Sequence, residues 1–130
     1  MPPMVVTSQK IENLVRFLPH FTKERDIFVN HIQEKGCYTF ADYPEDVWQF
    51  IKIIYDDWFL EAFDWAAWQP QAAVFIEDAA HLATADLETL QKLLTLHVRK
   101  ERASEGHLAT VLASGHIAAI LKRLAELKST

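Results

Sequence analysis

The stretch PEDVWQFIKIIYDDW, residues 44–58, is the clearest guide to the fold of this chain. Large apolar side chains recur in it at steps of three and one, which is the spacing of one buried face of an α-helix. Pro44 suits the first helical position, where its missing N–H leaves no donor without a partner. Glu45 and Asp46 put negative charge at the positive end of the helix dipole. The stretch predicts a helix with this inward face: Val47, Phe50, Ile51, Ile54, Tyr55 and Trp58.

Toward the N-terminus, two more helices are expected. Thr7 or Ser8 can cap the first, and Pro19 marks its end because a proline disfavours helical backbone in the residue before it. The second is expected over residues 22–35, with Gly36 as its left-handed C-terminal cap. The residues between this glycine and the central helix are interpreted as a connection.

Toward the C-terminus, the aromatic-rich residues 59–69 break the helical period and are interpreted as a second connection. A short helix is expected over residues 70–78, and a longer one follows a cap at Thr84 or Asp86. The longer helix is predicted to turn the following residues inward: Leu87, Leu90, Leu94, His97 and Val98.

Two further helices complete the predicted chain. A break near Ala103 leads to a short helix that Ser114 and Gly115 end. The last helix ends in basic residues, which suits the negative end of its dipole. It is predicted to bury Ile117, Ile120, Leu121 and Leu124.

Length and composition agree with a single helical domain. The chain has 130 residues, of which 50% are hydrophobic and 24% charged, and it contains only 3 glycines. A chain of this length buries enough surface to form one core. Abundant Ala, Leu, Glu and Lys favour helices. We expect an all-α fold, a compact single-domain bundle of about five to six helices over residues 1–130, with residues 1–7 flexible and residues 126–130 frayed.

Composition disfavours several functional classes. Cys37 is the only cysteine, so the chain forms no internal disulfide and no cysteine-based zinc site. No apolar run is long enough to span a bilayer, and the first residues do not resemble a secretory signal. We therefore expect a cytoplasmic protein. A formal net charge of −5 argues against general binding to nucleic acid.

Charge is unevenly distributed along the chain. Residues 1–91 hold 6 Lys and Arg against 15 Asp and Glu, whereas residues 92–130 hold 7 against 3. Two interpretations are open at this point. Either the acidic and basic parts attract each other across the fold, or the basic part faces an anionic ligand.

A polar segment near the C-terminus holds the candidate site. His97, on an inward face, is either a core residue paired with Glu101 or a distant carboxylate, or else a ligand, a base or a proton sensor. Arg99 and Arg102 share a helix face and can clamp a carboxylate or phosphate, or pair with acidic residues of the chain itself. Glu105 caps the next helix or acts as a general acid or base. The candidate binding residues are His97, Arg99, Arg102, Glu105, His107, His116 and Trp65.

The polar segment contains a short internal repeat: GHLATVL at residues 106–112 is similar to GHIAAIL at residues 115–121. If Gly115 breaks the helix, His107 and His116 both begin helices and lie on the same side. The alternative is that this pattern is only a simple way to restart a short helix.

No metal and no cofactor are expected. His97 and Glu101 are one helical turn apart, but no His-Glu-x-x-His motif or third ligand at helical spacing accompanies them. The scattered glycines do not form a phosphate-binding loop. Trp65 can stack on a flat ligand, although tryptophans of this kind are more often core residues.

The order of several motifs resembles a family of small bacterial proteins known only as a domain of unknown function. The motifs include FDWxxW at residues 63–68, HVRKxRxxEGHL at residues 97–108 and SGHI at residues 114–117. The resemblance spans about residues 8–126 and implies one compact domain and a bacterial source, but no activity. The chain departs from the family pattern at Ala103-Ser104, where an aromatic residue and a cysteine are expected.

Two functional hypotheses from different classes follow. The first is a binding or regulatory module without catalysis, with a second copy of the chain or another protein as its partner. The second is an enzyme or a protein that binds a small anionic ligand through the histidine, arginine and glutamate cluster of residues 97–116. Because no catalytic signature is present in the sequence, the first hypothesis is favoured.

Overall fold

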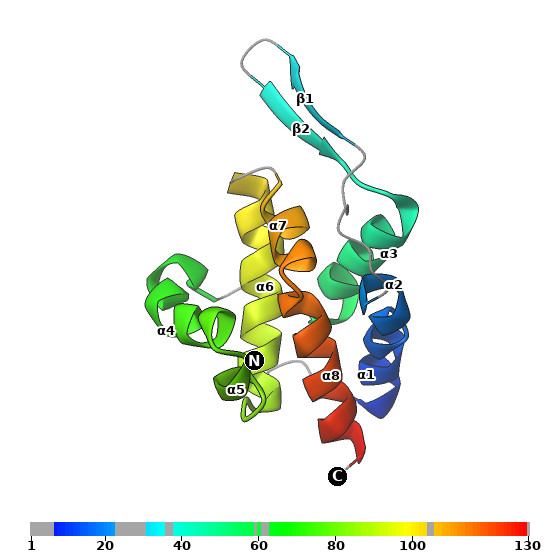
Figure 1. Ribbon diagram of the computed structural model, residues 1–130, viewed down its shortest axis with the longest axis vertical. Coiled ribbons are helices and arrows are strands. Elements are labelled where there is room, and N and C mark those ends of the chain that lie inside the picture. Colours follow the sequence, from blue (N-terminus) through cyan, green and yellow to red (C-terminus); the bar gives the residue numbers. More distant parts are fainter. Residues whose placement is uncertain are drawn as a thin grey trace.

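A computed structural model of the chain describes residues 7–22, 31–35, 38–58, 60, 63–103 and 106–129 (Figure 1). These residues form eight α-helices, a π-helical turn and an antiparallel hairpin of two strands. The elements are α1 (Ser8–Val15), α2 (Leu18–Thr22), β1 (His31–Lys35), β2 (Tyr38–Asp42), α3 (Glu45–Ile53), η1 (Ile54–Trp58), α4 (Trp65–Glu77), α5 (Ala79–Leu82), α6 (Leu87–Ala103), α7 (His107–Ala113) and α8 (His116–Ser129). The predicted all-α class is confirmed, with one short hairpin added, while the helices of the described residues outnumber the predicted five to six.

Helix α6 is the centre of the fold. Figure 1 shows it running between α4 and α5 on one side and α1 and α3 on the other. It packs against α4, η1, α7 and α8. Its middle is buried on every side, since residues 93–98 are all buried. The inward face predicted for this helix is therefore correct but too narrow, because neighbours cover the helix all round.

The helix predicted from the opening stretch is confirmed with two corrections. Pro44 is the N-cap, so α3 begins one residue later than expected. The last turn widens into the π-helical η1. Five of the six predicted inward residues are buried, but Tyr55 is 36% exposed. The wider turn changes the direction in which its side chains point, and Tyr55 is left at the edge of the core.

The first predicted helix is shorter than expected. Thr7 caps it as predicted, because its hydroxyl oxygen accepts a bond from the backbone N–H of Lys10. The helix ends at Val15, and Pro19 lies inside the separate short helix α2. The prediction that this proline marks the end of the first helix is therefore wrong. A proline is tolerated in the first turn of α2 because that turn needs no internal N–H bond.

The helix predicted over residues 22–35 is wrong at its C-terminal end. Residues 31–35 pair with residues 38–42, in a register that places His31 opposite Asp42. The predicted connection before the central helix is thus also wrong, because β2 occupies most of it. Tyr, Thr and Phe in β2 favour a strand, and cross-strand bonding satisfies the backbone. Residues 23–30 and 36–37, with the predicted glycine cap, lie outside the described residues.

Helix α4 begins earlier than predicted and replaces part of the aromatic connection. Its N-cap is Asp64, whose carboxylate accepts a bond of 3.2 Å from the N–H of Ala67. Pro70 was expected to begin a helix but lies inside α4. Its missing N–H costs the helix one hydrogen bond near the N-terminus. Trp65 is partly buried and packs against the core.

The C-terminal helices agree with the sequence prediction. Asp86 caps α6 by accepting a bond of 2.8 Å from the N–H of Thr89. Hydrogen bonding with the side chain of Thr89, and next with its backbone, lowers the pKa of the Asp86 carboxyl group. Helix α6 ends at Ala103, next to the predicted break. Helix α8 continues to Ser129, past the position from which fraying was expected.

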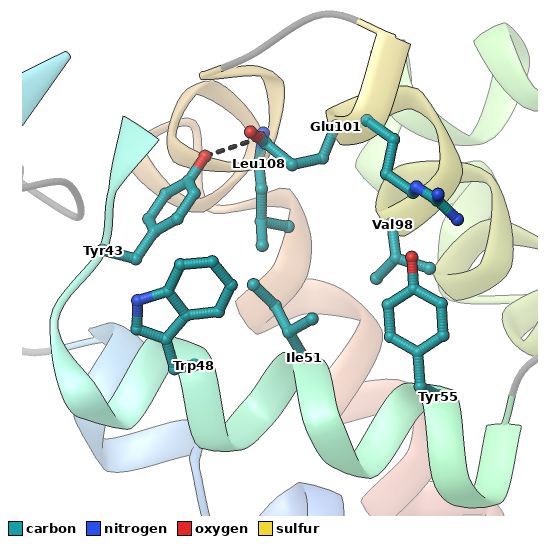
Figure 2. Close-up of a pocket in the computed structure, with 8 residues that line it drawn as sticks. Tyr43, Trp48, Ile51, Tyr55, Val98, Glu101 and Leu108 are labelled. Carbon is teal, nitrogen blue, oxygen red and sulfur yellow. Dashed lines mark hydrogen bonds between the residues drawn. The ribbon is translucent and has the colours of Figure 1, made fainter. Parts of the chain in front are cut away.

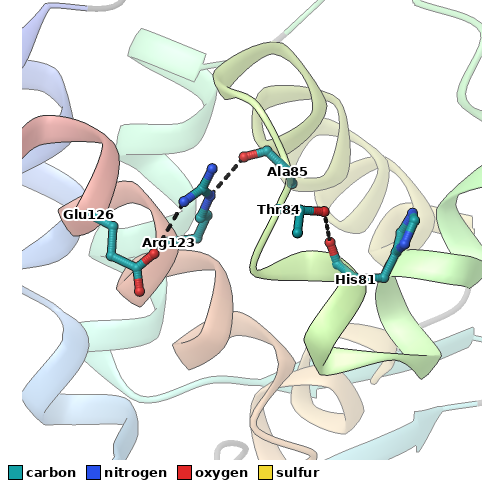
Figure 3. Close-up of polar contacts among 5 residues, drawn as sticks. All are labelled: His81, Thr84, Ala85, Arg123 and Glu126. Atoms are coloured by element: carbon teal, nitrogen blue, oxygen red, sulfur yellow. Dashed lines mark hydrogen bonds and ion pairs between the residues drawn. The ribbon is translucent and has the colours of Figure 1, made fainter. Parts of the chain in front are cut away.

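Helix α8 is tied to the start of α6 by Arg123 (Figure 3). The Nε of Arg123 donates a bond of 2.8 Å to the carbonyl oxygen of Ala85, and the guanidinium pairs with Glu126 at 3.2 Å. Just before Ala85, the Thr84 hydroxyl donates to the carbonyl oxygen of His81 at 2.7 Å. These contacts hold the loop before α6 against α8.

No single helix of the described residues is long and apolar enough to cross a membrane. Helices α7 and α8 pass the same test of length and composition only as a pair, bent by 67°. Both helices contribute buried side chains to the core: Leu108, Val111, Leu112, Ile117, Ile120, Leu121 and Leu124.

Candidate functional site

Three histidines from different helices meet inside the fold. We call His97, His107 and His116 the histidine cluster. His97 lies on α6 and is 1% exposed, while His107 and His116 are the first residues of α7 and α8. The Nδ1 of His97 lies 3.0 Å from the Nε2 of His107, a hydrogen bond between the two rings. The His116 ring meets the His97 ring edge-on, with centroids 5.0 Å apart.

The repeated Gly-His pattern builds this cluster. Gly106 and Gly115 both have positive φ, 94° and 85°, which reverses the chain direction just before each histidine. The prediction that His107 and His116 begin helices and lie on the same side is therefore confirmed. His97 is paired with His107, so the predicted pairing with Glu101 or a distant carboxylate is wrong.

The cluster is electrically neutral at neutral pH. Burial lowers the pKa of His97 well below its ordinary value. Burial also lowers the pKa of His107 to about 4, with a further contribution from the charge of Lys100. The pKa of His116 falls to about 4, again mainly because of burial. A neutral imidazole inside the fold neither attracts an anion nor donates a proton easily.

Two of the three rings of the cluster, those of His97 and His116, are buried. The Nε2 atoms of His97 and His116 are buried and have no hydrogen-bond partner. Among the residues that the structure describes, no group of three or more His, Cys, Asp or Glu side chains has an arrangement that could hold a metal ion. The three rings thus act as packed, partly unsatisfied core groups.

Glu101 organises the neighbouring turn between α6 and α7. Its carboxylate accepts bonds from the backbone N–H of Gly106 at 3.0 Å and of Leu108 at 2.8 Å. It also accepts a bond of 2.5 Å from the hydroxyl of Tyr43, whose oxygen in turn accepts the N–H of Ala109 at 3.3 Å. This carboxylate therefore caps α7 and anchors Tyr43, and its oxygens are occupied.

A cavity of about 130 Å³ opens beside this turn, between α3 and α6 (Figure 2). We call it the aromatic cavity. Its lining residues are Tyr43, Trp48, Ile51, Tyr55, Val98, Glu101, Arg102 and Leu108. Figure 2 shows Trp48, Ile51 and Tyr55 pointing from α3 and η1 toward α6 and α7.

The aromatic cavity has a buried floor and an accessible rim. Ile51, Val98 and Leu108 are buried, and they form an apolar floor. Trp48 is 50% exposed and, with the partly exposed Tyr55, lies where solvent enters. The Trp48 and Tyr43 rings meet edge-on, with centroids 5.8 Å apart. The floor and rim together make a concave apolar surface of the kind that holds small ligands.

Arg102 supplies the positive charge of the aromatic cavity. It lines the cavity and its side chain is exposed. No ion pair joins it to a carboxylate within the described part of the chain. Its partner on the predicted arginine face, Arg99, is half-buried and does not line the cavity. Of the two arginines that the sequence placed on one helix face, only Arg102 therefore lines this cavity.

The remaining predicted site residues that the structure describes do not line this cavity. Glu105 lies outside the described residues, and so does Ser104 of the family departure. Trp65 and the histidine cluster are absent from the cavity lining. Sequence reasoning missed Tyr43, Trp48 and Tyr55. The spacing of Trp48, Ile51 and Tyr55 on one helix face was the signal that could have found them.

Among the described ion pairs, Lys128 joins the basic residues 92–130 to the acidic residues 1–91 across the fold, and the other lysine and arginine pairs are local. Lys52, Lys92 and Arg123 pair with carboxylates three or four residues away, and Lys128 pairs with Glu12 near the N-terminus. Helix α6 instead meets η1 and α4 through apolar packing. At the C-terminal end of α6, Arg102 is exposed and has no ion pair in the described part of the chain.

Two other hollows border α4, and neither combines aromatic walls with an available cation. One, of about 160 Å³, holds Lys100, whose Nζ donates to the Oε1 of Gln69 at 3.4 Å. The other, of about 240 Å³, is bordered by His116 and by Glu77. The aromatic cavity is smaller, but its polar and aromatic groups converge on one space, which is the better criterion for a binding site.

The chain is similar to a known family of proteins. A model of a family of unknown function (DUF6508) matches residues 6–130, nearly the whole chain. No curated protein and no solved structure matches it.

Proposed function

The chain belongs to this family of unknown function, and on that premise we propose that it is a binding module without catalysis, whose aromatic cavity holds a small organic anion. The observation that carries the proposal is the position of Arg102. Its exposed guanidinium borders an apolar cavity and has no carboxylate partner in the described part of the chain. A guanidinium beside an apolar space fits a molecule with one apolar and one anionic end.

Support for a role without catalysis comes from the polar groups near the cavity. Glu101 is occupied by three donors, so it is poorly placed to take a proton from a ligand. The histidine cluster does not line the cavity. The other polar lining groups are tyrosines and a tryptophan, which orient a ligand more readily than they attack one.

Thermal denaturation with a panel of small organic anions tests the proposal. A ligand present at 100 times its dissociation constant adds about 2.7 kcal/mol to the free energy of unfolding. We expect at least one anion to raise the melting temperature of the wild-type protein by several degrees. Arg102→Ala should abolish that shift while leaving the melting temperature of the free protein nearly unchanged.

Lys122→Ala is the matched control, because it removes one exposed positive charge from α8, away from the cavity lining. It should keep the ligand-induced shift. If no anion shifts the wild-type protein, or if Arg102→Ala responds as the wild type does, the aromatic cavity is not an anion site.

The cellular setting of this module is part of the proposal. A cytoplasmic location, a bacterial source and a homo-oligomer or protein partner are predictions from the sequence. Size-exclusion chromatography with light scattering measures the oligomeric state directly. A monomer at all concentrations would remove self-association from the proposal.

A further inference from the structure

We infer that the ligand of the aromatic cavity is a carboxylate monoanion with a single aromatic ring, of which benzoate is the simplest example. This inference rests on the proposed function, since it names the class of anion that the cavity takes. Three properties of the cavity carry it: its volume, its aromatic walls and the balance of its two charges.

The volume of the cavity limits the apolar end of the ligand to about one six-membered ring. It measures about 130 Å³. An apolar protein cavity of about 150 Å³ is known to accept benzene. Buried Ile51 and Leu108 sit against the packed core, so the floor does not recede easily to admit a second fused ring.

The walls of the cavity favour a flat aromatic ring over an aliphatic one. Tyr43 is 3% exposed and its hydroxyl is held by Glu101, so its ring has a fixed orientation. Trp48 meets that ring edge-on at an interplanar angle of 86°. A third ring in the cavity can continue this edge-to-face arrangement, which is the preferred geometry of aromatic groups. Tyr55, on the far side of Ile51, adds another aromatic wall.

The charges of the lining favour one negative charge on the ligand. Arg102 offers a planar pair of donors that matches a carboxylate. Glu101, the residue before Arg102, lines the same cavity and carries a negative charge. Its carboxylate is held there by backbone and tyrosine donors and does not move aside. A ligand with two negative charges, such as a phosphate monoester, therefore meets repulsion as well as attraction.

Isothermal titration of the full chain with four compounds tests the inference. The compounds are benzoate, cyclohexanecarboxylate, phenyl phosphate and benzyl alcohol. Benzoate should bind most tightly. Cyclohexanecarboxylate should bind about 2- to 10-fold more weakly because it lacks the aromatic contact. Benzyl alcohol and phenyl phosphate should each bind at least about 10-fold more weakly than benzoate. Benzyl alcohol has no negative charge to pair with Arg102, and phenyl phosphate has a second negative charge that Glu101 repels.

Variants of Trp48 test whether its ring causes the preference for benzoate over cyclohexanecarboxylate. Trp48→Leu should bring benzoate and cyclohexanecarboxylate to equal affinity, whereas Trp48→Phe should keep the preference for benzoate. Because Trp48 is 50% exposed, both variants should fold, and circular dichroism checks this. An unchanged preference in folded Trp48→Leu would overturn the assignment of the aromatic wall.

The outcomes separate this inference from the proposed function. If cyclohexanecarboxylate or phenyl phosphate binds as tightly as benzoate and the binding needs Arg102, the cavity is an anion site but the inferred class is wrong. If none of the compounds binds and the wider anion panel also gives no shift, both the inference and the proposed function fail.

Discussion

The histidine cluster and the aromatic cavity share α6 and α7, where neighbouring residues belong to one or the other, yet they differ in almost every physical respect. His97 belongs to the cluster and Val98 to the cavity, and the same holds for His107 and Leu108. The cluster is largely buried, neutral and partly unsatisfied. The cavity is open, aromatic and bordered by a charge. The histidines that draw attention in the sequence are thus largely buried, and the accessible space is lined mainly by aromatic and apolar residues together with Glu101 and Arg102.

This difference shows that accessibility, rather than residue type, decides where a ligand can bind. A step of one residue along a helix turns the side chain by about 100°. In α6 that step separates an imidazole packed among three helices from a side chain that faces the gap between α3 and α6.

Acid should destabilise the protein through the histidine cluster. The folded state lowers the pKa of all three imidazoles, to about 4 for His107 and His116, whereas the unfolded chain keeps them near the ordinary 6.5. Their contribution to stability is complete above pH 6.5 and is lost as the pH falls toward the folded values. Each histidine can cost up to about 1.4 kcal/mol per pH unit in that window. Urea denaturation at several pH values between 7.5 and 5 measures the slope.

Removing one of the three imidazoles should make the free energy of unfolding depend less steeply on pH. His116→Gln should reduce that slope by about a third, while His81→Gln, at an exposed site, should leave it unchanged. A free energy of unfolding that stays constant between pH 7.5 and 5 would contradict the picture of a buried neutral cluster.

Loss of the Glu101 carboxylate should destabilise the turn that divides the two regions. Glu101→Ala leaves two backbone N–H groups and the Tyr43 hydroxyl without their acceptor. We expect a loss of about 2–4 kcal/mol in the free energy of unfolding. Glu88→Ala, which removes an exposed partner of Lys92, should change it by less than about 0.5 kcal/mol. Equal effects of the two variants would argue against a structural role for Glu101.

Gly115→Ala tests the backbone geometry that delivers His116 to the cluster. Gly115 has φ of +85° and open space around the position of a Cβ, so any cost comes from backbone strain alone. We expect a loss of about 1–2 kcal/mol in the free energy of unfolding. A neutral result in urea denaturation would mean that the turn before α8 adapts without strain.

The smallest effect on stability should come from the cavity rim. Arg102→Ala removes an exposed side chain without an ion pair in the described part of the chain, so its free energy of unfolding should change by less than about 0.5 kcal/mol. A loss above about 1 kcal/mol would identify Arg102 as a structural residue and weaken the proposed binding role. Chemical denaturation of the free protein measures this independently of any ligand.

Much of the helical fold was predictable because its signals are local. The 44–58 helix, the cap at Asp86 and the glycine turns at 106 and 115 each depend on a few neighbouring residues. The prediction failed over residues 31–42, where pairing between two strands decides the structure. It also failed to start α4 at Trp65, because aromatic residues with no clean period give no helical signal.

The candidate site was only partly predictable. The sequence drew attention to residues 97–108, and Arg102 was among the predicted site residues. Tyr43, Trp48 and Tyr55 were missed because they come from elements far away in the chain and approach α6 only in the folded state. The partner of His97 was missed for the same reason, since a restarted helix rather than the next turn of α6 supplies it.

The amino-acid sequence alone is enough to predict that this chain is mainly helical, where its C-terminal helices begin and end, and that two histidines start them. Caps, glycine turns and apolar periods act over a few residues, so they can be recognised without knowledge of the fold. Which polar residues are buried and which face a cavity follows from the tertiary structure. Burial depends on how α3, α6, α7 and α8 pack together, and that packing buries most of the histidine cluster and leaves the space beside Arg102 open.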